Sequence, residues 1–174
     1  MKIVTIFAEK LFAFQYDSEK RDEYARLLDC WTDPEYLIDF AERNEQYLPS
    51  DMSVEDFTTD IQDDAEALEE ALMKCIENNI SLNTCFQPVH NQEYKSKILS
   101  FQKKKCKYLR LYAIKIDDDC FVITGGAIKL TRTMQDHPET DKELGKLDIC
   151  KNYLNSERAF DKDSFYELII EEIL

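Results

Sequence analysis

The densest group of side chains that could do chemistry lies between residues 103 and 132. It consists of basic residues with one tyrosine among them: Lys103, Lys104, Lys105, Lys107, Arg110, Tyr112, Lys129 and Arg132. Basic and aromatic side chains on strands suit contact with nucleic-acid phosphates and stacking on bases. They also suit metal-free cleavage of RNA, in which the 2′-hydroxyl attacks its own phosphate. Such an enzyme must stabilise charge on the phosphoryl oxygens and move protons.

Fixed guanidinium and ammonium groups meet the first need, and Tyr112 and His137 are candidates for the second. Residues 108–116 alternate in the manner of a strand, which places Arg110 and Tyr112 on one face. The opposite face is the more apolar one because it carries Ala113, so we expect it to meet the core. Arg110 and Tyr112 should then emerge together into solvent.

The charge of the chain is unevenly distributed. The formal net charge of −14 hides a segment, residues 91–135, whose own balance is +6, between segments of −14 and −6. This field would repel a polyanion over most of the surface and admit it at one patch. An alternative is that the basic strand pairs with acidic helices of the same chain. The acids of residues 60–70 are expected to form a solvated helix face: Asp60, Asp63, Asp64, Glu66, Glu69 and Glu70.

Several classes of protein are disfavoured. The three glycines at 125, 126 and 145 cannot form a Walker A loop or a GxGxxG fingerprint. The six cysteines show no metal-ligand spacing, so we expect reduced, buried thiols and neither metal nor cofactor. With no apolar run long enough to span a membrane and no signal-peptide core at the start, we expect a cytoplasmic protein that does not bind membranes.

The elements that must position these residues follow from periodicity and capping signals. Residues 3–16 predict one strand or a hairpin bending near Glu9, and helices are expected over 19–31, 34–48, 53–77, 140–154 and 164–173. Strands are expected over 108–116 and 120–131. Gly125-Gly126 interrupts the second strand, which indicates a bulge or a close backbone approach. This order predicts an α+β fold, a small antiparallel sheet packed with several helices, in a single domain over 1–174. Residues 1–50 would add a strand and a helical extension to residues 51–174.

The segment over residues 100–154 resembles the C-terminal part of HigB/RelE-like toxins. In that family an arginine-bearing strand is followed by a hydrophobic strand, a glycine region, a lysine with a nearby threonine, and a helix. Arg110 matches the strand arginine and Lys129 the lysine, while Lys107 and Arg132 match more weakly. The resemblance implies a RelE-like core and ribosome-associated, metal-free mRNA cleavage, restrained by an antitoxin protein.

The first hypothesis is therefore a RelE/HigB-like endoribonuclease. Its catalytic residues would be Arg110, Tyr112 and Lys129, and the RNA-binding residues would be Lys103, Lys104, Lys105, Lys107 and Arg132. The second hypothesis is a non-catalytic interaction protein on the same fold that binds a protein partner through its acidic helices. A third, suggested by net charge alone, is an acidic mimic of nucleic acid.

Overall fold

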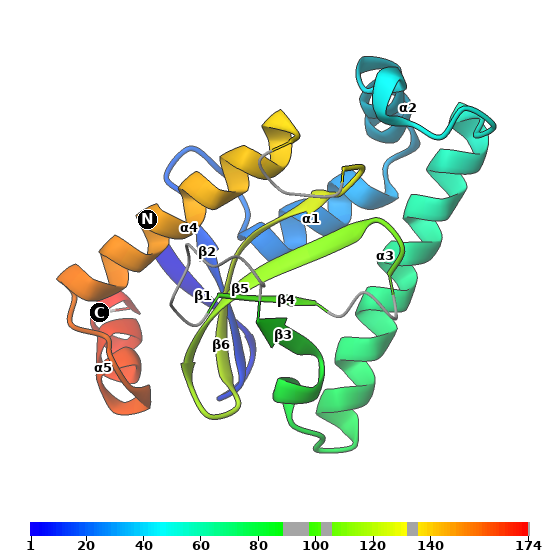
Figure 1. Ribbon diagram of the computed structural model, residues 1–174. Coiled ribbons are helices and arrows are strands. Elements are labelled where there is room, and N and C mark those ends of the chain that lie inside the picture. Colours follow the sequence, from blue (N-terminus) through cyan, green and yellow to red (C-terminus); the bar gives the residue numbers. More distant parts are fainter. Residues whose placement is uncertain (89–97, 102–105, 132–135, 174) are drawn as a thin grey trace.

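The computed structural model describes residues 1–88, 98–101, 106–131 and 136–173 of the chain (Figure 1). It is an α+β protein, as expected. The strands are β1 (Lys2–Phe7), β2 (Leu11–Gln15), β3 (Phe86–Pro88), β4 (Ile98–Phe101), β5 (Leu109–Asp117) and β6 (Cys120–Ile128). The helices are α1 (Glu23–Thr32), α2 (Pro34–Arg43), α3 (Val54–Glu77), α4 (Pro138–Ser156) and α5 (Lys162–Ile173), with 3-10 turns η1 (Glu45–Tyr47) and η2 (Leu82–Thr84).

The strands form one sheet in the order β1-β2-β6-β5-β4-β3. Neighbouring strands are antiparallel except β2 and β6, which run parallel with Leu11 opposite Phe121. Of the two predictions for residues 3–16, one strand or a hairpin, the structure shows the hairpin. Glu9 takes a positive φ of 66° in its turn. The parallel pair differs from the antiparallel sheet expected, because helices α1 to α3 carry the chain away from β2 before it returns to the sheet.

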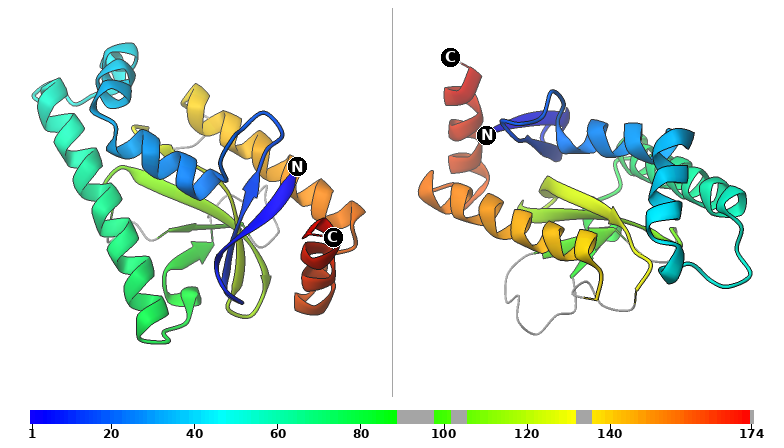
Figure 2. Two further views of the ribbon diagram at one scale, coloured as in Figure 1. Left: turned by 180° about the vertical axis from the view of Figure 1, so that it is seen from behind. Right: turned by 90° about the horizontal axis from the view of Figure 1, so that it is seen from above.

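Helices cover both faces of the sheet (Figure 2). On one face, β5 residues Leu109, Leu111 and Ala113 pack in a core with α1, α2 and α3. On the other face, Tyr112 and Ile114 pack in a second core with α4 and α5. Residues from β2 enter both cores, so the first fifty residues supply part of the interior rather than an appended layer.

Helix boundaries follow local capping chemistry. The Asp33 side chain accepts a hydrogen bond from the Glu35 amide at the start of α2, and Ser53 caps α3, as the sequence predicted. Helix α4 instead begins at Pro138, with His137 rather than Thr140 as its cap. A proline at the first helical position loses no hydrogen bond, which explains the earlier start. In the described ranges, no helix combines the length and apolar character that a bilayer crossing requires.

Candidate functional site

Arg110 does not emerge into solvent, contrary to the sequence-based expectation. Only 7% of its surface is exposed. Its Nη1 donates hydrogen bonds to the backbone carbonyl oxygens of Leu109 at 2.7 Å and Cys106 at 3.2 Å. Burial lowers the pKa of the guanidinium, which is still charged at neutral pH because an arginine starts far above it. Arg110 therefore braces the chain entering β5 rather than presenting its charge to a ligand.

Tyr112 is buried as well, with 2% of its surface exposed. It lies opposite Gly125 of β6, and its hydroxyl has no hydrogen-bond partner among the described residues. Burial raises the pKa of the phenol well above its ordinary value, so it stays protonated. The expectation that Tyr112 faces solvent beside Arg110 is thus wrong, because α4 and α5 cover this face of β5.

A pattern in the sequence could have revealed this burial. Ile114 and Ile116 lie on the same face as Tyr112, and all three belong to one core, while Leu109, Leu111 and Ala113 belong to the other. A strand that is apolar on both faces is typical of one covered on both sides. Ranking the two faces of the strand by Ala113 alone hides that pattern.

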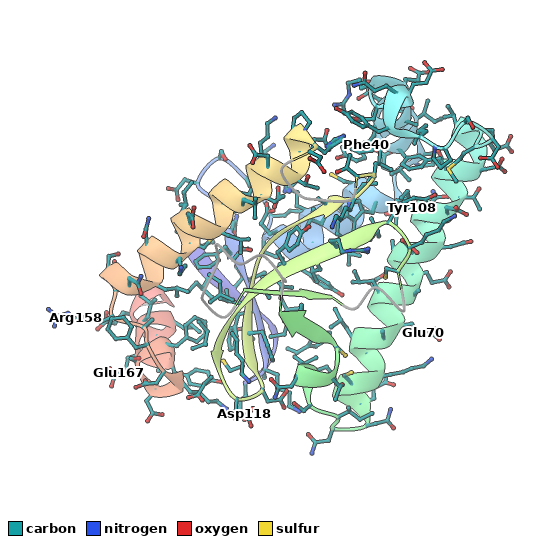
Figure 3. The ribbon with its side chains drawn as sticks, in the orientation of Figure 1. Phe40, Glu70, Tyr108, Asp118, Arg158 and Glu167 are labelled. Atoms are coloured by element: carbon teal, nitrogen blue, oxygen red, sulfur yellow. The ribbon has the colours of Figure 1, made fainter. Side chains whose placement is uncertain are left out.

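Lys107 and Lys129 lie at one end of the hairpin formed by β5 and β6. The Lys129 amide donates to the Tyr108 carbonyl oxygen at 2.8 Å, which joins the chain entering β5 to the chain leaving β6. Figure 3 shows Tyr108 at this end of β5 and Asp118 at the other. The Lys107 side chain is 63% exposed, and the Lys129 side chain is half-buried. Lys103, Lys104, Lys105 and Arg132 lie outside the described residues.

Lys107 also takes part in the pairing that the alternative interpretation expected. Its Nζ lies 3.1 Å from Asp60 Oδ2 of α3 and 4.9 Å from the centre of the Tyr108 ring. The hydrogen bond to Asp60 raises the pKa of Lys107, which keeps the ammonium charged. An exposed ion pair of this kind contributes little to stability, so a phosphate could replace Asp60 at small cost.

Asp64 is the residue that sets the position of this end of the sheet, and sequence analysis missed it. Its Oδ1 accepts from the Lys107 amide at 2.8 Å, and its Oδ2 accepts from the Tyr108 and Leu109 amides at 2.6 and 3.0 Å. The side chain is buried, unlike the solvated acid face expected. The sequence feature that predicts this burial is the spacing of Asp64, three residues after Ile61 and four before Leu68. That spacing places it within the apolar stripe of α3.

A second group of charges lies where α1 and α4 meet over Gly125. Glu23 of α1 is 1% exposed and accepts two hydrogen bonds from Arg26, at 2.6 and 2.9 Å. Lys146 of α4 lies 3.2 Å from Glu23 and 2.9 Å from Glu143, so one ammonium bridges two carboxylates. The Lys146–Glu23 ion pair joins α4 to α1, whereas the other two pairs each lie within one helix.

Glu143 is the least satisfied member of this group. Its Oε1 faces Lys146, but its buried Oε2 has no hydrogen-bond partner among the described residues. Burial raises the pKa of this carboxyl, while Lys146 opposes that rise. A Cβ atom built on Gly125 would lie 1.9 Å from Glu143 Oε2, so a glycine is needed there for the carboxylate to approach the strand.

His137 has a structural role. Its Nδ1 accepts from the Glu139 amide at 3.2 Å, and its Nε2 lies 2.7 Å from Asn44 Oδ1 at the end of α2. The ring is 1% exposed and packs edge-on against Tyr47. His137 therefore fastens the start of α4 to α2, and both of its ring nitrogens are taken up by these contacts.

No group of three or more potential metal ligands gathers within the part of the chain that the structure describes. Comparison of the chain with family models, curated proteins and solved structures finds no match to any of them.

Proposed function

We propose that the chain is a RelE/HigB-like protein that binds mRNA at the end of the β5–β6 hairpin and promotes its cleavage at the ribosome. The observation that carries the proposal is the Lys129–Tyr108 backbone hydrogen bond of 2.8 Å. It brings Lys129 to the same end of the sheet as Lys107 and Arg110, which precede it by 22 and 19 residues. The strand, glycine region, lysine and helix also follow one another in the order that the resemblance requires.

The roles of the residues differ from those assigned from sequence. Lys107 and Lys129 are the groups that would contact phosphate oxygens, since their side chains reach solvent at least in part. Fixed positive charge at this point stabilises negative charge that develops on a phosphoryl group. Arg110 and Asp64 act as positioning residues, because both hold the backbone that enters β5.

The second candidate is a non-catalytic interaction protein that binds a partner through its acidic helices. Burial of Arg110 and Tyr112 favours it, because two of the three candidate catalytic groups do not reach a substrate. The outer side of α3 also presents exposed carboxylates, among them Glu70, which points away from the sheet in Figure 3. Such a surface would attract a basic partner.

Protein synthesis in a bacterial host after induction separates the two candidates. Wild type should shut synthesis down, and the Lys107→Ala/Lys129→Ala variant should not. The matched control, Lys20→Ala/Lys142→Ala, removes the same charge from exposed positions and should act as wild type does. Unchanged synthesis with all three at equal soluble expression would reject the toxin proposal and favour the interaction protein. Arg110→Ala is unsuitable for this test because the side chain is buried.

A further inference from the structure

Two buried cysteines lie face to face at the end of α3. The sulfur atoms of Cys75, in the last turn of that helix, and Cys85, directly after η2, are 2.6 Å apart. A disulfide bond measures about 2.05 Å. Both side chains are buried, with 4% and 1% of their surfaces exposed. We propose that Cys75 and Cys85 are a redox site that forms a reversible intramolecular disulfide with disulfide-bearing oxidants.

The backbone holds the two sulfur atoms in place before any bond forms. After α3 ends, the Ile80 amide donates to the Cys75 carbonyl oxygen at 2.8 Å, which turns the chain back along the helix. The Asp119 carboxylate, from the β5–β6 turn, then accepts from the Leu82 amide at 2.6 Å and fixes η2. The chain therefore needs no large rearrangement to bring Cys75 and Cys85 together.

The reaction is ordinary thiol–disulfide exchange. One cysteine loses its proton to solvent, and its thiolate attacks a sulfur of the oxidant, which releases one thiol and leaves a mixed disulfide. The second cysteine, deprotonated in turn, displaces the remaining oxidant sulfur as a second thiol. The protein loses two electrons and two protons, and the oxidant disulfide gains both. A thiol reductant reverses the sequence.

Access to the pair comes from the side of η2. The Thr84 residue is exposed, and its hydroxyl oxygen lies 4.0 Å from Cys75 Sγ and 3.9 Å from Cys85 Sγ. Opening of this short turn would expose the sulfur atoms and would lift Leu82 and Cys85 from the edge of the first core, leaving the rest of that core and the second core in place. Local openings of this kind cost less than global unfolding.

The other cysteines have different surroundings, which makes the pair selective. The Cys106 thiol donates to the Asp64 carbonyl oxygen at 3.5 Å, and Cys150 Sγ lies 3.1 Å from the Tyr16 hydroxyl. Cys30 is the one half-buried thiol, the others being buried, so it is the natural site for unselective oxidation. Reaction at Cys75 and Cys85 ahead of Cys30 would therefore depend on proximity rather than access.

The test uses the full-length protein with oxidised glutathione as the probe. After equilibration, free thiols are alkylated in denaturant, counted by mass spectrometry and mapped in unreduced peptides. We expect wild type to fall from six free thiols to four, with a Cys75–Cys85 peptide pair, and to regain six with dithiothreitol. The disulfide would close the short loop between Cys75 and Cys85 and lower the entropy of the unfolded chain. The oxidised protein should therefore melt roughly 5–10 °C higher than the reduced protein.

Variants make the assignment specific. Cys30→Ser should still lose two thiols, whereas Cys75→Ser and Cys85→Ser should form no internal disulfide. Six thiols retained in wild type would overturn the proposal, and so would glutathione adducts at Cys30 in place of the Cys75–Cys85 pair. The wild-type peptide map decides the question even if a serine variant folds poorly.

Discussion

The two strand glycines offer a sharp test of how α1 and α4 pack on β6. A Cβ at Gly126 would lie 2.7 Å from the Arg110 carbonyl oxygen and 2.9 Å from both Leu27 and Trp31. A backbone oxygen in a paired strand cannot move aside, so overpacking should cost about 3 kcal/mol. Alanine offsets about 0.5–1 kcal/mol of this through its lower backbone entropy loss. We expect Gly126→Ala to lower the free energy of unfolding by roughly 2 kcal/mol.

At Gly125 the obstacle is a side chain, Glu143 Oε2 at 1.9 Å, which can shift only by straining its contact with Lys146. Gly125→Ala should therefore cost about 1 kcal/mol net. In a Glu143→Ala background the nearest remaining atom outside residue 143 is Glu23 Oε2 at 3.5 Å, an ordinary contact. There the same substitution should be neutral or slightly stabilising. The sign of the effect should change between the two backgrounds.

Urea denaturation followed by the fluorescence of Trp31, the single tryptophan, measures each of these differences. Gly145→Ala is the matched control, because a Cβ there meets nothing within 4 Å on the exposed side of α4. It should raise stability by about 0.8–1 kcal/mol through helix propensity. Equal costs for Gly125→Ala with and without Glu143 would refute the packing described here, as would a Gly126→Ala variant as stable as wild type.

Three further predictions concern buried polar groups. Burial raises the pKa of Glu143 in the folded state above its ordinary 4.5. At a pH between the ordinary pKa and the raised one, the folded state therefore binds more protons than the unfolded state. The free energy of unfolding of wild type should fall as pH rises through that interval. Glu143→Gln cannot titrate at this position, so its free energy of unfolding should fall less. Parallel curves of unfolding free energy against pH for the two proteins would contradict this prediction. Asp64→Ala should cost about 3 kcal/mol or more in chemical denaturation, since three amides lose their acceptor, whereas its exposed neighbour Asp63→Ala should change stability by under about 0.5 kcal/mol. His137→Ala should lower the melting temperature more than His137→Asn, because asparagine also caps helices; equal losses would argue against the capping role.

Local chemistry made much of the fold predictable. The N-terminal hairpin, the start of α2 at Pro34 and both ends of α3 follow from turn and capping residues and from helical spacing. The bulge expected at the glycine pair is present, as a register shift beside Tyr112. These features depend on residues close in sequence, which is why turn residues, capping residues and periodicity together identify them.

The candidate site was less predictable because it depends on which elements cover which face. The burial of Tyr112 results from α4 and α5 packing on the side of β5 opposite α3. Residues 108–116 are apolar on both faces, which indicates a covering layer on each side but not which helices form it. The contact between Glu23 and Lys146 joins residues 123 positions apart. A helical wheel could still have revealed Asp64, since a carboxylate within an apolar stripe indicates a buried acceptor.

Cleavage of mRNA on translating ribosomes by the purified protein, mapped from the new 5′ ends, tests the proposed function most directly. We expect discrete cuts with wild type, cuts reduced at least tenfold with Lys107→Ala/Lys129→Ala, and unchanged cutting with Lys20→Ala/Lys142→Ala. Intact mRNA with wild-type protein, or equal cutting by all three proteins, would contradict the assignment of RNA contact to this end of the sheet.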